Sequence, residues 1–195
     1  WRLHEGAARG WRVLAERLDA VRELPLERWE VDAFHSTVMD VAGCSYTRHG
    51  GFVRGIEVFD AAKFGIAMGE AACMDPQQRL VLTMGYAALH GAGQRRGTLT
   101  LDPSSGGVFL GIERPDWALS HPPRHSVYAV SSDNISAAAG RLAFVLDLQG
   151  PCASMDTACS SALIALHAAV GVVKDGESSL AAALAVGLKL SPIPT

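Results

Sequence analysis

Cys159 is the residue whose type and position best suit chemistry, within the segment CASMDTACSSALIALHAAV. Residues 152–158 look like a strand and residues 160–173 like a nearly all-apolar helix, so the sequence predicts a sharp strand-to-helix turn at this thiol. At a helix N-terminus, unpaired backbone N–H groups and the helix dipole favour a thiolate. The same groups could stabilise an acyl oxyanion. The pattern indicates a nucleophilic cysteine, with a packed and inert thiol as the alternative, because free cysteines are often buried.

No histidine of the same predicted helix is placed to assist this thiol. His167 follows Cys159 by eight residues, about 12 Å along a helix axis, which is beyond hydrogen-bond reach. We interpret His167 as a core histidine. His121 and His125 form an H-x-x-x-H pattern, but the two prolines between them prevent a shared helical face. We therefore predict no metal site.

Composition and charge exclude several classes of protein. Of the 195 residues, 49% are hydrophobic and 19% are charged, which is typical of a globular chain with a real core. The net charge of −3 gives no electrostatic footprint for nucleic acid or for an anionic membrane. The longest apolar stretch, residues 162–173, is shorter than the roughly 18 residues of a membrane span. We expect neither a nucleic-acid nor a membrane partner.

The cysteines and the missing motifs exclude further classes of function. Cys44, Cys73, Cys152 and Cys159 are widely spaced and form no C-x-x-C pair, so a reducing, cytoplasmic setting is expected. The sequence contains no P-loop, no G-x-G-x-x-G and no G-x-S-x-G. Nucleotide binding and serine hydrolysis of the elbow type therefore have no support.

The elements that must position Cys159 alternate between helices and short buried strands. Asp75 and Pro76 are a strong helix start, and Leu80, Met84 and Ala88 would form the buried face of that helix. The expected elements are a helix over 10–21, a loop over 26–51 with a short hairpin that can use Gly50 and Gly51, a helix over 76–90, a strand over 107–112, a surface loop over 113–126, a helix over 133–146 and a strand over 180–190. This alternation favours an α/β layered fold.

Four stretches then form a recognisable series. They are YTRHGGF at 46–52, FDAAKFGI with MDPQQRL at 59–80, GVFLG at 107–111, and GP followed by DTACSSAL at 150–163. In this order the chain resembles the N-terminal half of a β-ketoacyl synthase domain, in particular the ketosynthase of type I polyketide synthases. DTACSSAL matches the active-site signature of that family, and MDPQQRL is nearly as distinctive.

The resemblance implies a thiolase-like layered αβαβα fold, mainly its N-terminal half. It implies a decarboxylative Claisen condensation that extends an acyl chain held as a thioester on Cys159. No cofactor would be bound directly, because substrates arrive on the phosphopantetheine of an acyl carrier protein. The implied partners are that carrier protein, a second copy in a homodimer, and an adjoining acyltransferase or other synthase domains.

Some family features have no match in this chain. The two histidines and the lysine that assist condensation belong to the family's second half, and the usual first strand is also missing. We therefore expect residues 1–195 to form part of a larger domain and to be inactive alone. The alternative from a different class is a catalytically incomplete scaffold or dimerisation partner. A thiolase or another cysteine acyltransferase is disfavoured by MDPQQRL.

Overall fold

A parallel sheet of three strands lies at the centre of the fold. The strands are β3 (Gly106–Ile112), β4 (Cys152–Met155) and β5 (Leu180–Val186), in the order β4-β3-β5. All seven residues of β3 are buried, as its continuous apolar sequence GGVFLGI predicts. Gly111 of β3 lies opposite Met155 of β4 and Ala185 of β5. The carboxyl ends of the three strands therefore meet at one edge of the sheet.

The computed structural model describes residues 10–38, 41–94, 106–120, 127–128 and 134–192. None of the helices in these parts is long and apolar enough to cross a membrane. Besides the sheet, the elements in chain order are β1 (Arg22–Glu23), η1 (Val31–Ala33), β2 (His49–Gly50), η2 (Ala62–Phe64), α2 (Met68–Cys73), α3 (Pro76–Gly91), α4 (Trp117–Ser120), α6 (Ile135–Leu146), η4 (Ala158–Ser160) and α7 (Ser161–Lys174).

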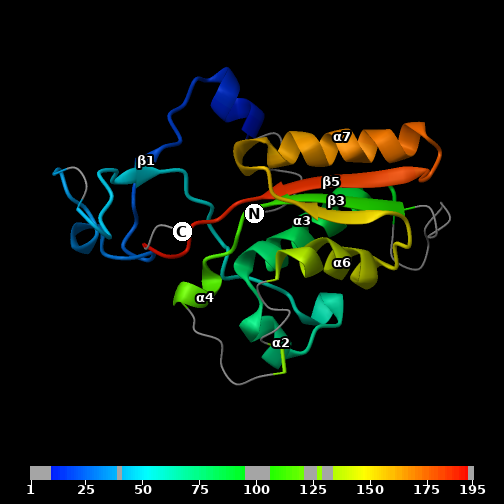
Figure 1. Cartoon of the computed structure of the whole chain (residues 1–195), viewed down its shortest axis with the longest axis horizontal. Coiled ribbons are helices and arrows are strands. Elements are labelled where there is room, and N and C mark those ends of the chain that lie inside the picture. Colours follow the sequence, from blue (N-terminus) through cyan, green and yellow to red (C-terminus); the bar gives the residue numbers. More distant parts are fainter. Residues whose placement is uncertain (1–9, 39–40, 95–105, 121–126, 129–133, 193–195) are drawn as a thin grey trace.

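Helices cover both faces of the sheet, as Figure 1 shows. On one face α7 packs its small residues Ala165 and Ala169 against Phe109 of β3. On the other face α3 and α6 bury the larger cluster, which includes Leu82, Leu110 and Leu142. The described residues thus form three layers, helix, sheet and helix, and the predicted α/β layering is confirmed.

The start of α3 is as predicted, but its buried face is not. The Asp75 carboxylate accepts a hydrogen bond from the Gln77 backbone N–H at 2.6 Å, and Pro76 occupies the first turn. The predicted core residues Met84 and Ala88 are exposed, however. The residues that are buried instead lie one position along, at Val81, Leu82, Gly85 and Leu89.

Gly85 explains this rotation of the helix. A Cβ on Gly85 would lie 2.5 Å from Cδ2 of Leu142, so α3 turns its glycine toward α6 and the two helices approach closely. The helix predicted over 133–146 is present as α6, which begins at Ile135; residue 133 lies outside the described residues. The Asn134 side chain accepts a hydrogen bond from the Ser136 backbone N–H at 2.9 Å at its start.

The N-terminal part of the chain departs from the prediction. Only residues 10–15 of its described part are helical, and the chain turns at Arg17, whose φ is 53°. Trp11, Leu14, Leu18 and Val21 are exposed. An amphipathic helix is stabilised chiefly by tertiary packing of its apolar face, and the described chain offers that face no partner surface.

The predicted hairpin was also wrong in its pairing. β2 pairs in antiparallel fashion with β1, so that Arg22 lies opposite Gly50. Gly50 is therefore a strand residue, and the ladder joins two segments that are distant in sequence. The segment 113–126 was predicted as a surface loop, yet it contains α4, and Asp116 before α4 is only 2% exposed. The remainder of this segment, with His121 and His125, lies outside the described residues.

Candidate active site

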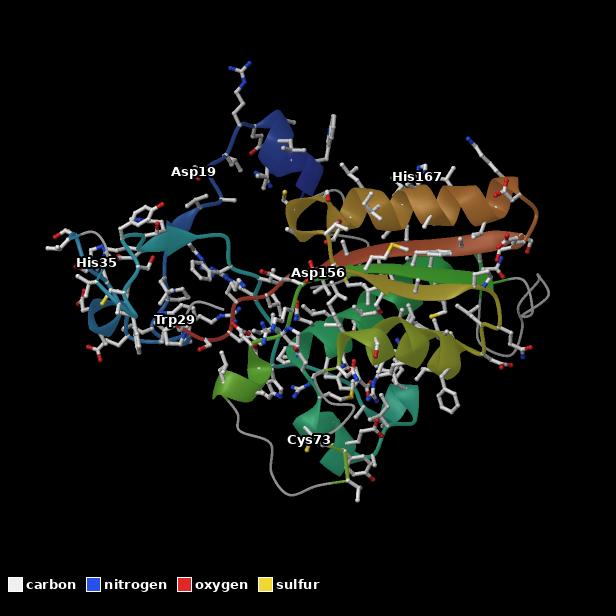
Figure 2. The ribbon with its side chains drawn as sticks, viewed as in Figure 1. Asp19, Trp29, His35, Cys73, Asp156 and His167 are labelled. Carbon is white, nitrogen blue, oxygen red and sulfur yellow. The ribbon has the colours of Figure 1, made fainter. Side chains whose placement is uncertain are left out.

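Cys159 lies at the junction between β4 and α7, as the sequence predicts. β4 ends at Met155, one turn of 3-10 helix (η4) contains Cys159, and α7 begins at Ser161. The Cys159 side chain is exposed, so the alternative of a packed thiol finds no support in the described chain. Figure 2 labels Asp156 where this junction leaves the sheet.

The backbone just before Cys159 is strained. Ala158 has a φ of 55°, in the left-handed region that costs an L-residue on the order of 1–2 kcal/mol. Such conformations persist only where the surrounding structure holds them, and they are common at active sites. Alanine has the smallest side chain that can take this strain, and the conformation turns the chain sharply between strand and helix.

Side chains around the turn hold this conformation. The Thr157 backbone N–H donates to Oγ of Ser161 at 2.8 Å, and the Ser161 hydroxyl donates to the Ala158 carbonyl at 2.8 Å. The Asp156 carboxylate accepts from the Ala158 backbone N–H at 3.0 Å, and the Ser160 hydroxyl donates to the Thr157 carbonyl at 2.8 Å. Every residue that flanks Cys159 in the turn is thus hydrogen-bonded to another.

Gly111 allows α7 to begin directly on the sheet. A Cβ on Gly111 would lie 2.7 Å from the carbonyl carbon and oxygen of Ser161 and 3.0 Å from the backbone nitrogen of Ala162. No side chain other than hydrogen fits that approach. The first turn of α7, and with it Cys159, is therefore held against the carboxyl end of β3.

A buried amide ties α3 to the same edge of the sheet. Gln77 is fully buried; its Oε1 accepts from the Leu188 backbone N–H at 3.1 Å, and its Nε2 donates to the Glu113 carbonyl at 3.4 Å. Leu188 follows β5 and Glu113 follows β3. One side chain of the MDPQQRL segment thus joins the ends of β3 and β5, and β3 lies beside β4, the strand that leads to Cys159.

The segment after β5 is held by a carboxylate. Oδ2 of Asp116 accepts from the backbone N–H groups of Leu190 at 2.8 Å and Ser191 at 3.0 Å. Sequence analysis missed Asp116, Gln77 and Gly111, because each acts through residues far away along the chain. The only available signal was that Gln77 lies in MDPQQRL and Gly111 in GVFLG, two stretches of the family pattern; Asp116 lies in neither.

His167 does not lie in the core. It is exposed, and Figure 2 shows it on the side of α7 that faces away from the sheet. The interpretation as a core histidine was wrong, because α7 buries only the face of Ser161, Ala165 and Ala169. His49 and His90 are exposed as well. Within the described residues, no group of three or more His, Cys, Asp or Glu side chains could hold a metal ion.

The other cysteines have different settings from Cys159. Cys44 and Cys73 are half-buried. Cys152 occupies the first position of β4, and the residue as a whole is exposed. Its thiol is nevertheless partly shielded from solvent, and this burial raises the pKa of the thiol. A raised pKa lowers the thiolate fraction at neutral pH. Cys152 is therefore a poor nucleophile and serves as a matched comparison for Cys159.

The sequence matches a family model described as Beta-ketoacyl synthase, N-terminal domain, over residues 3–195. Among curated proteins, it is 39% identical over 188 residues to mycoketide-CoA synthase of Mycobacterium tuberculosis, covering 93% of this chain and 4% of that protein. It is 39% identical over 190 residues to an erythronolide synthase of Saccharopolyspora erythraea, covering 93% of this chain and 6% of that protein. The chain thus spans a small part of these relatives.

Solved structures show the same fold. An oxazolomycin ketosynthase domain from Streptomyces albus superposes with a TM-score of 0.84 at 30% identity, covering 95% of this chain and 32% of that chain. The ketosynthase from module 6 of the bacillaene synthase of Bacillus subtilis gives a TM-score of 0.75 at 33% identity, covering 93% of this chain and 29% of that chain. The expected thiolase-like α/β fold is confirmed.

Proposed function

The chain belongs to the β-ketoacyl synthase family, as its N-terminal domain, and on that premise we propose that Cys159 accepts the acyl chain from a carrier-protein thioester. The observation that carries this proposal is the exposed thiol on a strained, hydrogen-bonded turn immediately before α7. A nucleophile on such a turn is accessible and is held in a fixed direction.

In the proposed loading step, the Cys159 thiolate attacks the carbonyl carbon of a thioester on the carrier's phosphopantetheine. A carbon–sulfur bond to Cys159 forms, and the carbonyl oxygen becomes an oxyanion. Backbone N–H groups around Cys159 would stabilise that charge. The bond to the phosphopantetheine sulfur then breaks and this thiolate leaves, so that the acyl group rests on Cys159.

In the proposed condensation step, a malonyl-type extender loses CO₂ and its carbanion attacks the acyl carbonyl. The new carbon–carbon bond forms as the bond to Cys159 breaks, and the Cys159 thiolate is restored. The histidines and the lysine that assist this step in the family belong to its second half. The residues of this chain would accordingly load the acyl group, while the rest of the domain would complete the condensation.

The wider assembly forms part of the same proposal. Residues 1–195 would be the N-terminal part of one condensing domain, since the chain spans about a third of the solved ketosynthase chains it matches. Its partners would be an acyl carrier protein, adjoining acyltransferase or other synthase domains, and a second copy. The homodimer is supported by β4, an edge strand of the described sheet. The cytoplasm is the proposed location.

Acyl loading of the full-length protein tests the assignment of Cys159. The protein is incubated with an acyl thioester, and the adduct is mapped by mass spectrometry. We expect the label on Cys159, its loss in Cys159→Ala, and full labelling in Cys152→Ala, which removes the other exposed thiol. Cys159→Ala should leave the fold intact, because an exposed side chain of small volume is removed.

A label on any other residue, or none at all, would reject the assignment. If the wild-type protein stays unlabelled while it folds and binds the carrier protein, the alternative of a non-catalytic scaffold or dimerisation partner stands in its place. The retained thiol at position 159 argues against that alternative, because a scaffold has no use for it.

A further inference from the structure

A cation-rich pocket lies between the N-terminal ladder and the carboxyl edge of the sheet. Its volume is about 790 Å³, within the range of small-molecule sites. Its walls come from β1, the segments 25–28 and 52–57, the first turn of α3, α4 and Leu190 after β5. The pocket is thus built from parts distant in sequence and is separate from the turn that bears Cys159, which does not line it.

The charge in this pocket is opposite to that of the whole chain. Four arginines line it, Arg22, Arg28, Arg54 and Arg79, against two glutamates, Glu27 and Glu57. The lining therefore carries two positive charges in excess, whereas the full chain has a net charge of −3. Clustering of like charges is unfavourable unless an anion compensates it.

Backbone carbonyls hold two of these arginines in place, and both are partly buried. Nη2 of Arg28 donates to the Val53 carbonyl at 3.1 Å, and Nη2 of Arg79 donates to the Met74 carbonyl at 2.7 Å. Burial lowers the pKa of Arg79, and its buried Nε has no hydrogen-bond partner. Burial also lowers the pKa of Arg28; Glu57 opposes this effect and the positive charge of Arg22 adds to it. Burial is the largest cause of both shifts. Asp75 opposes it at Arg79 and Asp116 opposes it at Arg28, but neither carboxylate lines the pocket.

Aromatic and apolar groups complete the lining. The guanidinium of Arg22 lies 5.6 Å from the centre of the Phe52 ring, and that of Arg79 lies 5.6 Å from the Trp117 ring. Such contacts restrict arginine side chains that are otherwise flexible. The pocket can therefore hold an anionic group at its guanidinium forks and an apolar body beside its rings.

We propose that this pocket binds a small organic phosphate monoester. A phosphate monoester carries about −1.5 to −2 charges at pH 7, which matches the excess of two positive charges, whereas a carboxylate or a phosphodiester carries only one. Guanidinium groups bind phosphoryl oxygens in pairs. The inference goes beyond the proposed function, and no part of it depends on acyl loading.

Calorimetric titration of the full-length protein with phenyl phosphate, inorganic phosphate and diethyl phosphate tests this site. We expect phenyl phosphate to bind more tightly than inorganic phosphate, because its ring gains the apolar lining, and diethyl phosphate to bind most weakly. Arg28→Ala and Arg54→Ala should each weaken phenyl phosphate binding about tenfold or more. Equal binding of diethyl phosphate would overturn the monoester assignment.

Two control variants keep the result specific. Arg12→Ala removes an exposed arginine that pairs with Glu16 at 2.8 Å and lies outside the pocket, so binding should be unchanged. Arg54→Lys keeps the charge at an exposed position and should restore part of the affinity. Cys159→Ala should bind normally, which separates this site from the acyl site. Absence of binding to the wild-type protein, or equal affinity in all variants, would reject the pocket as a phosphate site.

Discussion

At Gly111 and Ala158 the setting of Cys159 depends on the absence of bulk. Cys159 and its turn could be predicted from the local sequence, because a strand, a thiol and an apolar helix follow one another. The role of Gly111 could not be predicted in this way. Gly111 has no Cβ and therefore leaves room for the backbone of Ser161, which belongs to a different element. Local sequence patterns predict where a chain turns, but they do not show which distant residue must be small for the turn to pack.

Gly111→Ala should lower the free energy of unfolding by about 1–3 kcal/mol. The added methyl would meet backbone atoms of Ser161 at 2.7 Å, and backbone cannot move aside as a flexible side chain does. Denaturant unfolding measures the loss, and the rate of acyl loading on Cys159 should fall as well.

Gly140→Ala is the matched control for this substitution. Gly140 lies in α6, and no atom stands within 4 Å of its added Cβ, so alanine should stabilise the helix by roughly 0.5–1 kcal/mol. If both variants change stability equally, close packing of α7 on β3 is not what requires glycine at position 111.

The error at His167 has a physical cause. The helix of which it is part is apolar almost all round, which is typical of a helix buried on every side. In the described chain, only the side facing the sheet is covered, and His167 points away from it. The hydrophobic pattern predicted that α7 has much apolar surface. It did not predict which side of the helix the described chain covers.

Among the elements, α3 shows what capping and periodicity can and cannot predict. Asp75 and Pro76 mark its start correctly, because capping is local chemistry. Its buried face was displaced by one position, because two glutamines and Gly85 are buried, and periodicity alone does not assign glutamine or glycine to a core. Gln77 is buried for its hydrogen bonds rather than for its hydrophobicity.

Gln77→Leu should destabilise the attachment of α3 to the edge of the sheet. The substitution keeps the volume similar but leaves the Leu188 backbone N–H and the Glu113 carbonyl without their partner, at a cost of about 1–3 kcal/mol. Hydrogen exchange should show faster exchange of the Leu188 amide.

Gln149→Leu supplies the comparison for Gln77→Leu. Gln149 is exposed and bonds only weakly to Asp147, at 3.5 Å, so its loss should change stability by less than about 0.5 kcal/mol. Unchanged exchange at Leu188 in Gln77→Leu would contradict the proposed clamp.

For the molecule as a whole, the outer face of α7 is an exposed apolar surface of the described chain. Leu163 is 69% exposed and Leu166 is 50% exposed. The other exposed large apolar residues of the helix are Ile164, Val170 and Val173. Contiguous apolar surface of this kind marks an interface. The composition predicted a chain with a real core, and the structure shows that a part of its apolar content lies outside that core.

The 195-residue chain, expressed alone, should therefore associate and be poorly soluble. Replacing Leu163 and Leu166 with lysine should increase the monomer fraction in light scattering. Phe144→Lys is the control, because Phe144 is 87% exposed on α6 and stands apart from that face. A monodisperse wild-type monomer that melts cooperatively would contradict the prediction.

The pairing of β3 with β5 sets an order of events during synthesis. β3 is made early, yet its two neighbours, β4 and β5, emerge from the ribosome only after residues 155 and 186. Pairing between segments so distant in sequence is slow, because the intervening chain must first be ordered. The turn at Cys159 emerges before β5 and before Leu188, the residue that Gln77 binds. The hydrogen bonds that hold the turn lie within residues 156–161 and form as soon as the thiol has emerged, whereas the bond of Gln77 to Leu188 forms later. A nascent chain that stalls before residue 188 would therefore present Cys159 on its turn but on an unfinished scaffold.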